Sequence, residues 1–306
     1  MSEPHLSERI YYLDGITNTK ESKVHLGKPP GLKWIIIGMK LLSKISSRLT
    51  AKLVLQAFVK PRNRPQHKIS DQLLEEAKLQ FIALGDKQVA TFKWEGGSKK
   101  ALLLHGWESR STAMRSLVPE LRKYGYTVIG LDAPAHGLSS GQKTNVVEYS
   151  DCILAAWKEF GEFDLVLTHS FGGLAISYAF ANKSLPGLKT IVMFAQPAST
   201  RLALGNFVKL LELNDNVYRQ LDEMIFNLSG FTTDQMSVEY FMKDVNSVNG
   251  LLFHDQDDNL VPISVAEQVV KSWPTSKLYV THNNGHFRLI KSPLVLKVLN
   301  DYMQKQ

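Results

Sequence analysis

The chain has 306 residues, long enough for one large domain with additions, and its 44% hydrophobic and 21% charged residues are typical of a globular protein. The single cysteine, Cys152, excludes an internal disulfide and a cysteine-rich metal site. We therefore expect a reducing, cytoplasmic setting. The longest early apolar run, residues 34–39, is far too short for a membrane span, and no signal peptide is expected.

The net charge of +7 belongs to one segment of the chain. Residues 22–70 contain eleven Lys and Arg residues and no Asp or Glu, which leaves a net charge of −4 for all other residues together. The basic character is therefore expected to serve this segment and not the body of the protein.

The basic segment has a helical pattern. Residues 1–30 show no sustained periodicity and are expected to form an irregular arm. From Leu32 to about Val59 the pattern predicts a basic amphipathic helix, because apolar and basic residues each recur every four positions on separate faces. The apolar residues are Ile37, Leu41, Ile45 and Leu49, and the basic ones are Lys40, Lys44, Arg48 and Lys52.

Two interpretations of this helix stay open. The favoured one is that its apolar face packs on the body of the protein or on a partner, with the lysines solvated. The alternative is peripheral contact of residues 32–60 with the anionic inner face of the membrane, with Trp34 at the interface. No nucleic acid is expected, because no aromatic platform accompanies the charges.

A Pro- and Arg-rich stretch, residues 60–65, marks the clearest boundary, because its prolines cannot continue a helix. It separates an N-terminal arm and basic helix, residues 1–65, from a larger domain, residues 66–306. At the start of that domain Ser70 is expected to cap a helix that runs through Ala83. Residues 88–94 alternate in polarity like an edge strand.

Strands and helices then alternate along the chain. Apolar runs predict strands at residues 100–104, 127–131, 165–167, 188–194, 250–253 and 277–280, with helical patterns between them. This order predicts the α/β class, with a mostly parallel central sheet and helices on both faces. From about 196 to 249 the alternation stops, and we expect a helical lid insertion there.

One of these strands runs into a sharp turn with a serine at its tip. Leu165-Val-Leu167 leads to Ser170, and Gly172-Gly173 begins the next helix. A strand that turns abruptly into a helix exposes the side chain at the bend and leaves the next backbone N–H at a helix N-terminus. We expect Ser170 to be a nucleophile and the Phe171 amide to stabilise an oxyanion.

Five ordered motifs carry a resemblance to the α/β-hydrolase superfamily. They are His105-Gly106-Trp107, the loop from Asp132 to Ser139, the turn around Ser170, the stretch from Asp258 to Pro262, and Gly285-His286. Together they cover about residues 88–303. The turn departs from the nucleophile elbow pattern G-x-S-x-G, because Thr168 replaces the first glycine. More closely, the chain resembles uncharacterised bacterial α/β-fold hydrolases with a basic N-terminal extension.

The resemblance implies roles for further residues. Asp258 aligns with the acid that orients the catalytic histidine, and Asp257 is the less favoured alternative. His286 aligns with the base, whereas His105, His169 and His254 are expected to be hydrogen-bonded framework residues. The amides of Trp107 and Phe171 would form the oxyanion hole, and the Asp132 loop would be structural.

The expected function is that of a serine hydrolase of the esterase, lipase or thioesterase type. It would cleave a small-molecule carboxylic ester or thioester through an acyl-enzyme on Ser170, and no metal or cofactor is implied. Acyl transfer to an acceptor other than water would use the same triad. A different class also stays open, because Thr168 crowds the turn: a catalytically weak small-molecule receptor or membrane-docked binding protein.

Overall fold

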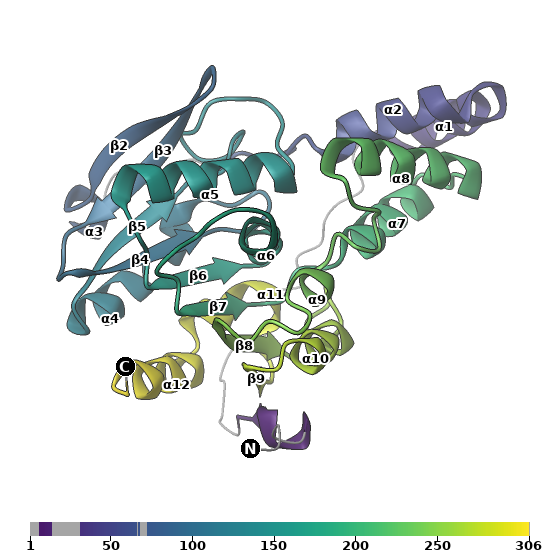
Figure 1. The fold of residues 1–306 in the computed structure, drawn as a ribbon. Coiled ribbons are helices and arrows are strands. Elements are labelled where there is room, and N and C mark those ends of the chain that lie inside the picture. The colour runs from purple at the N-terminus through teal and green to yellow at the C-terminus, as the bar shows by residue number, and fades with distance from the viewer. Residues whose placement is uncertain (1–5, 14–30, 66, 68–71, 306) are drawn as a thin grey trace. The chain divides into compact units, whose positions relative to one another are not determined.

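A nine-stranded sheet forms the centre of the first of two units in the chain (Figure 1). The computed structural model describes residues 6–13, 31–65, 67 and 72–305, and the sheet is built from strands within these ranges. From one edge to the other the strands are β1 (Ile10–Tyr12), β9 (Ser276–Thr281), β8 (Asn249–Asp255), β7 (Thr190–Phe194), β6 (Leu165–His169), β4 (Lys99–Leu104), β5 (Tyr126–Leu131), β3 (Lys87–Trp94) and β2 (Lys78–Leu84).

In this spatial order, the seven strands from β1 across to β5 all run parallel to one another. The pairs β5–β3 and β3–β2 are antiparallel. The central strands are buried on both faces, which is why they appear in the sequence as continuous apolar runs. The predicted class, a mostly parallel α/β sheet, is confirmed.

Helices cover both faces of this sheet. Ala101 and Leu103 of β4 lie in a core that includes α4 (Leu117–Lys123) and α12 (Pro293–Met303). Their neighbours Leu102 and Leu104 are equally buried and point to the opposite face, because side chains alternate along a strand. On that face α5 (Val146–Phe160) packs against α6 (Phe171–Asn182). The remaining elements of the unit are η1 (Leu6–Arg9), α3 (Gln72–Glu75), η2 (Ser111–Met114), α9 (Val238–Phe241), α10 (Ile263–Ser272), α11 (Gly285–Arg288) and η3 (Leu289–Lys291).

The expectation of an irregular N-terminal arm is wrong for residues 6–12. These residues form η1 and β1, and β1 adds a parallel edge strand to β9. The buried Arg9 side chain fixes this segment, because its Nη1 donates to the carbonyl oxygens of Trp273 at 2.8 Å and Pro274 at 3.0 Å. Residues 1–5 and 14–30 of the expected arm lie outside the described residues.

The helix expected through Ala83 is also wrong. Only α3 is helical there, and residues 78–84 form β2, which pairs with β3 as a hairpin. Ser70, its expected cap, lies outside the described residues. Ile82 of β2 is buried, whereas Leu79 and Phe81 remain exposed on this edge strand.

The second unit contains α1 (Leu32–Ile45), α2 (Ser47–Phe58), α7 (Thr200–Leu210) and α8 (Asp215–Ser229). Within it α2 packs on α8, α7 and α1 (Figure 1). The single helix expected over residues 32–59 is broken at Ser46, which has an extended backbone with φ −152°. The Ser46 hydroxyl accepts the Leu49 amide and so caps α2. In the part of the chain that the structure describes, no helix has the length and apolar character needed to cross a bilayer.

Candidate active site

Ser170 lies at the turn between β6 and α6 with φ 46° and ψ −116°. A positive φ is strained for a residue with a Cβ and requires about 1–3 kcal/mol from the surrounding structure. That support comes partly from the Ser170 amide, which donates to the carbonyl oxygens of Phe194 and Ala195 at 3.1 Å each. The Ser170 carbonyl accepts the Gly173 amide at 2.7 Å. The backbone at Ser170 therefore makes a strained turn from strand to helix, with the half-buried side chain at its tip.

The start of α6 lies very close to β4. A Cβ at Gly172 would be 2.5 Å from the Leu104 carbonyl oxygen and 2.9 Å from that of His105. Thr168, at the departure from the elbow pattern, is fully buried, and its hydroxyl donates to the Val192 carbonyl at 3.3 Å. Its Oγ1 lies 3.3 Å from the position that a Cβ on Gly173 would take. The missing side chain at Gly173 therefore makes room for Thr168.

The structure brings the predicted acid and base together. His286 Nδ1 lies 2.7 Å from Asp258 Oδ2, and both side chains are buried. Asp258 Oδ1 accepts the amides of Leu260 at 2.8 Å and Val261 at 3.0 Å. Burial alone raises the pKa of Asp258, but the hydrogen bonds from His286 and these amides hold it below its ordinary value. An ionised Asp258 assigns the proton to His286 Nδ1 and leaves Nε2 as an acceptor.

His169 connects this pair to the elbow. Its Nε2 donates to the His286 carbonyl at 2.9 Å, so His286 is tied to the residue that precedes Ser170. Burial lowers the pKa of His169 to about 4, which keeps the ring neutral. Among the described residues no hydrogen bond joins Ser170 Oγ to His286. His286 and Asp258 are thus paired, and the His286 carbonyl is held by the side chain of the residue before Ser170.

Asp255 and Asp257 hold the two loops that carry the acid and the base. Asp255 is fully buried, and its Oδ2 accepts the Thr281 hydroxyl at 2.6 Å and the Asn284 amide at 2.9 Å. Asp257 Oδ2 accepts the Asn283 amide at 3.0 Å. The two carboxylates therefore connect the end of β8 and the loop after it to the end of β9 and the loop that follows.

The two predicted oxyanion donors lie on neighbouring loops. Their side chains are in edge-to-face contact, with the ring centroids of Trp107 and Phe171 5.4 Å apart. A Cβ at Gly106 would lie 2.6 Å from His169 Nδ1, so the glycine allows the loop after β4 to approach the elbow. Within the described part of the chain, neither the Trp107 amide nor the Phe171 amide has a hydrogen-bond acceptor. Both donors are therefore available to a ligand.

A strap formed by residues 61–65 and 67 packs on the loop from Asp132 to Ser139, and the sequence did not reveal it. Asp132 is fully buried; its Oδ1 accepts the Ser111 amide and hydroxyl at 2.8 and 2.7 Å, and its Oδ2 accepts from His67 Nε2 at 2.8 Å. Glu108, the residue after Trp107, has φ 53° and accepts the Arg62 amide at 2.7 Å. The strap thus holds both the structural loop and the residue next to a predicted oxyanion donor.

Three further histidines are hydrogen-bonded framework residues in neutral form. His105 Nε2 accepts the Ala133 amide at 3.0 Å, so Nδ1 carries the proton and donates to the Gly106 carbonyl at 2.7 Å. His136 Nε2 accepts the Glu108 amide at 3.0 Å, and His254 Nδ1 accepts the Gln196 amide at 3.0 Å. Burial lowers the pKa of all three, that of His105 to about 3.

The lowered pKa values of the buried histidines predict that the stability of the fold depends on pH. His105 and His169 take up a proton near pH 6.5 when unfolded but only near pH 3 and 4 when folded. The unfolded state binds more protons in this window, so the free energy of unfolding should fall by about 1.4 kcal/mol per pH unit per histidine on acidification below about pH 6.5. Urea unfolding at a series of pH values measures this slope. The variant His105→Gln should show a clearly smaller slope, and an unchanged slope in this variant would contradict the assignment.

No cluster of three or more His, Cys, Asp or Glu side chains that could hold a metal ion occurs within residues 6–13, 31–65, 67 and 72–305.

Comparison with known proteins places this geometry in a family. A family model described as the Alpha/beta hydrolase family matches residues 101–295. No curated protein matches the chain. Solved structures are similar in fold: Pyrococcus furiosus esterase Pf2001 is 20% identical, with a TM-score of 0.59, covering 80% of this chain and 98% of that chain.

Two further solved structures with a similar fold belong to proteins of other kinds. Alpha/beta hydrolase domain-containing protein 10 from mouse is 15% identical, with a TM-score of 0.59, covering 75% of this chain and 98% of that one. The haloalkane dehalogenase DatA from Agrobacterium tumefaciens is 12% identical, with a TM-score of 0.58, covering 77% and 99%. At these identities the likeness concerns the fold, which serves different chemistries. Since the family model matches well over half of the chain, from β4 to the start of α12, the chain belongs to the alpha/beta hydrolase family.

Proposed function

We propose that this protein is a serine hydrolase that cleaves a carboxylic ester or thioester of a small molecule through an acyl-enzyme on Ser170. Family membership favours hydrolysis as the class of reaction. The observation that carries the finer proposal is the strained, half-buried Ser170 at the β6–α6 turn, with the His286–Asp258 pair tied to the adjacent His169.

In the first half of the reaction, His286 Nε2 takes the proton of Ser170 Oγ while Oγ attacks the acyl carbon. The Trp107 and Phe171 amides stabilise the oxyanion of the tetrahedral intermediate. The bond from the acyl carbon to the leaving oxygen or sulfur then breaks, and His286 returns its proton to the leaving group. Asp258 holds Nδ1 protonated and stabilises the imidazolium that forms.

In the second half, water replaces the leaving group. His286 Nε2 takes a proton from the water as its oxygen attacks the acyl carbon. The bond to Ser170 Oγ breaks, Oγ recovers the proton, and a carboxylic acid leaves. No metal or cofactor takes part in these steps.

The proposal is tested by intact-mass labelling with a fluorophosphonate, together with hydrolysis of a p-nitrophenyl ester. The wild type should gain one adduct, and Ser170→Ala should gain none and lose on the order of 10⁴-fold or more in kcat. Ser184 is exposed and lies outside the site, so Ser184→Ala should label and turn over like the wild type.

Two results would contradict the proposal. One is an adduct that persists in Ser170→Ala. The other is a folded wild type that gains no adduct and hydrolyses no ester, in which case the fold would serve as a small-molecule receptor.

A further inference from the structure

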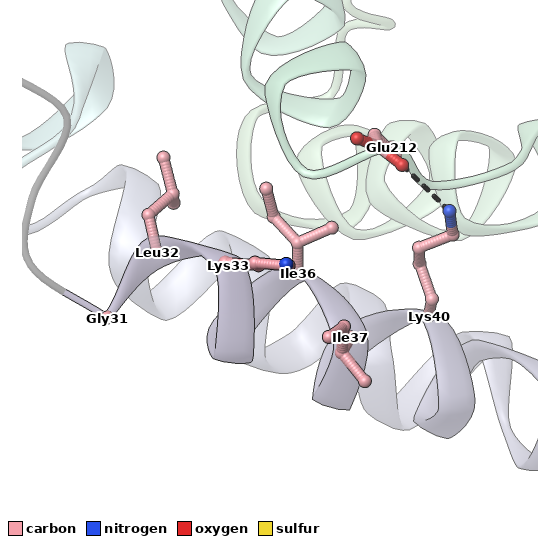
Figure 2. A pocket seen from close by; sticks show the side chains of 7 residues that line it. All are labelled: Gly31, Leu32, Lys33, Ile36, Ile37, Lys40 and Glu212. Atoms are coloured by element: carbon pink, nitrogen blue, oxygen red, sulfur yellow. Dashed lines mark hydrogen bonds and ion pairs between the residues drawn. The ribbon is translucent and has the colours of Figure 1, made fainter.

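Helix α1 has two apolar sides, and only one of them packs within its own unit. Leu32, Ile36 and Met39 are partly buried and Ser43 is buried, which defines the inner side. Figure 2 shows Ile36 and Lys40 directed toward the helices that flank Glu212, while Ile37 extends from the other side of α1. Lys40 Nζ lies 2.7 Å from Glu212 Oε2 in this region, beside an open hollow. The inner side therefore anchors the helix.

The other side of α1 consists of exposed apolar side chains. Trp34 is 75% exposed and Ile45 is 83% exposed. The spacing of these residues corresponds to one continuous stripe of a helix. We call the outer face the exposed apolar residues of α1 and α2, namely Trp34, Ile35, Ile37, Leu41, Ile45, Leu49 and Leu53. The run on α1 marks an interaction surface, since single exposed apolar residues are normal but contiguous ones are not. Leu49 and Leu53 are the exposed apolar residues of α2.

Basic side chains flank the outer face, and acidic ones are absent from its helices. The basic residues of α1 and α2 are Lys33, Lys40, Lys44, Arg48 and Lys52. Neither helix contains Asp or Glu. Apart from Lys40, which pairs with Glu212, these cations have no acidic partner among the described residues. The partner must therefore accept apolar side chains and supply negative charge along their flanks.

We propose that the outer face docks on the surface of an anionic phospholipid bilayer. An apolar stripe with an interfacial Trp and flanking lysines is the composition of a helix that lies in the plane of a bilayer. Lysines are depleted at protein–protein interfaces, whereas each one near an anionic leaflet strengthens binding about fivefold. The proposal goes beyond ester hydrolysis and does not depend on it.

Vesicle binding by the full-length protein tests this proposal. Phosphatidylcholine vesicles that contain phosphatidylglycerol should bind the protein, and pure phosphatidylcholine vesicles should bind it much more weakly. Added salt should weaken binding, because surface charges are screened. Trp34 is exposed, whereas Trp94, Trp157 and Trp273 are buried and Trp107 is partly buried, so the Trp34 fluorescence should shift to the blue on binding. Trp34→Phe should remove this shift.

Matched variants distinguish the contribution of the outer face to vesicle binding from general effects of surface charge and polarity. Lys33→Gln with Lys44→Gln should weaken binding roughly 25-fold. Lys158→Gln with Lys297→Gln removes the same charge from exposed positions on α5 and α12, and should leave binding within a few-fold. Leu41→Ser with Ile45→Ser should weaken binding by on the order of 100-fold, whereas Leu228→Ser on α8 should not.

Three results would overturn the proposal. The wild type could fail to bind anionic vesicles, or the outer-face and control variants could lose vesicle binding equally. The third is a protein that forms a dimer, which Leu41→Ser with Ile45→Ser dissociates, and that does not bind vesicles. Hydrolysis of a soluble ester and the melting temperature should stay unchanged in the outer-face variants, which separates their effect from misfolding. Failure of vesicle binding would leave the serine hydrolase proposal intact, because Ser170 labelling reports on a different site.

Discussion

Replacing Asp258 by Asn is expected to lower kcat by on the order of 10⁴-fold. Oδ1 of Asp258 accepts two backbone amides, so the amide oxygen of the asparagine will take that position. Its NH₂ group then faces His286 Nδ1, which must become an acceptor. The proton moves to Nε2, and His286 can no longer take the proton of Ser170. Hydrolysis of a p-nitrophenyl ester measures the loss, and thermal unfolding checks that the fold is intact.

The neighbouring Asp257→Asn is the matched control, because Asp257 was the alternative candidate for the acid. Its carboxylate accepts the Asn283 amide and lies 4.0 Å from His282 Nδ1, whereas His286 pairs with Asp258. An amide oxygen can accept the same bond, so kcat should fall by no more than a few-fold. A loss at Asp257 that equals the loss at Asp258 would reject the assignment of the acid.

Gly172→Ala is expected to destabilise the fold by about 3 kcal/mol and to reduce activity further. The new Cβ would lie 2.5 Å from the Leu104 carbonyl oxygen, which belongs to the backbone of a central strand and cannot rotate away. The start of α6 must then move, and with it the Phe171 amide. Urea unfolding measures the loss of stability, and kcat should fall at least tenfold in the population that remains folded.

Gly205→Ala provides the comparison. Gly205 lies inside α7, and a Cβ there would meet no atom within 4 Å. Alanine favours a helix over glycine, so this variant should be as stable as the wild type or slightly more so. If the two substitutions lowered stability equally, close packing of β4 and α6 would not be the cause.

The sheet could be predicted from the sequence where its signal is local. The strands β4 to β9 are short apolar runs between helical patterns, and each is buried mainly because a parallel sheet is covered on both faces. The hairpin of β2 and β3 was missed, although Gly85-Asp86 between two alternating runs is a hairpin signal. The apolar residues of β2 recur at spacings that a helix would also explain.

The candidate site also has parts that local sequence could predict and parts that it could not. Ser170, Asp258 and His286 each lie in a short motif that follows a strand, so local sequence and the family resemblance were enough to select them as candidates. Their catalytic roles stay a prediction. The contacts of His67 with Asp132 and of Arg62 with Glu108 connect residues 65 and 46 positions apart, and no spacing rule predicts such pairs. Ser46 interrupts an otherwise continuous helical pattern, because its hydroxyl competes for the backbone amide of Leu49.

The pairing of β1 with β9 has a consequence for how the chain folds during synthesis. Arg9 and Trp273 are 264 residues apart, so β1 leaves the ribosome long before β9 and cannot dock until β9 has been synthesised. The strands β4 to β8 can assemble during this interval, and β1 pairs with the edge of β9 afterwards. A shortened chain that lacks residues 6–12 would leave that edge unpaired, and we expect it to aggregate during expression before any loss of catalysis could be measured.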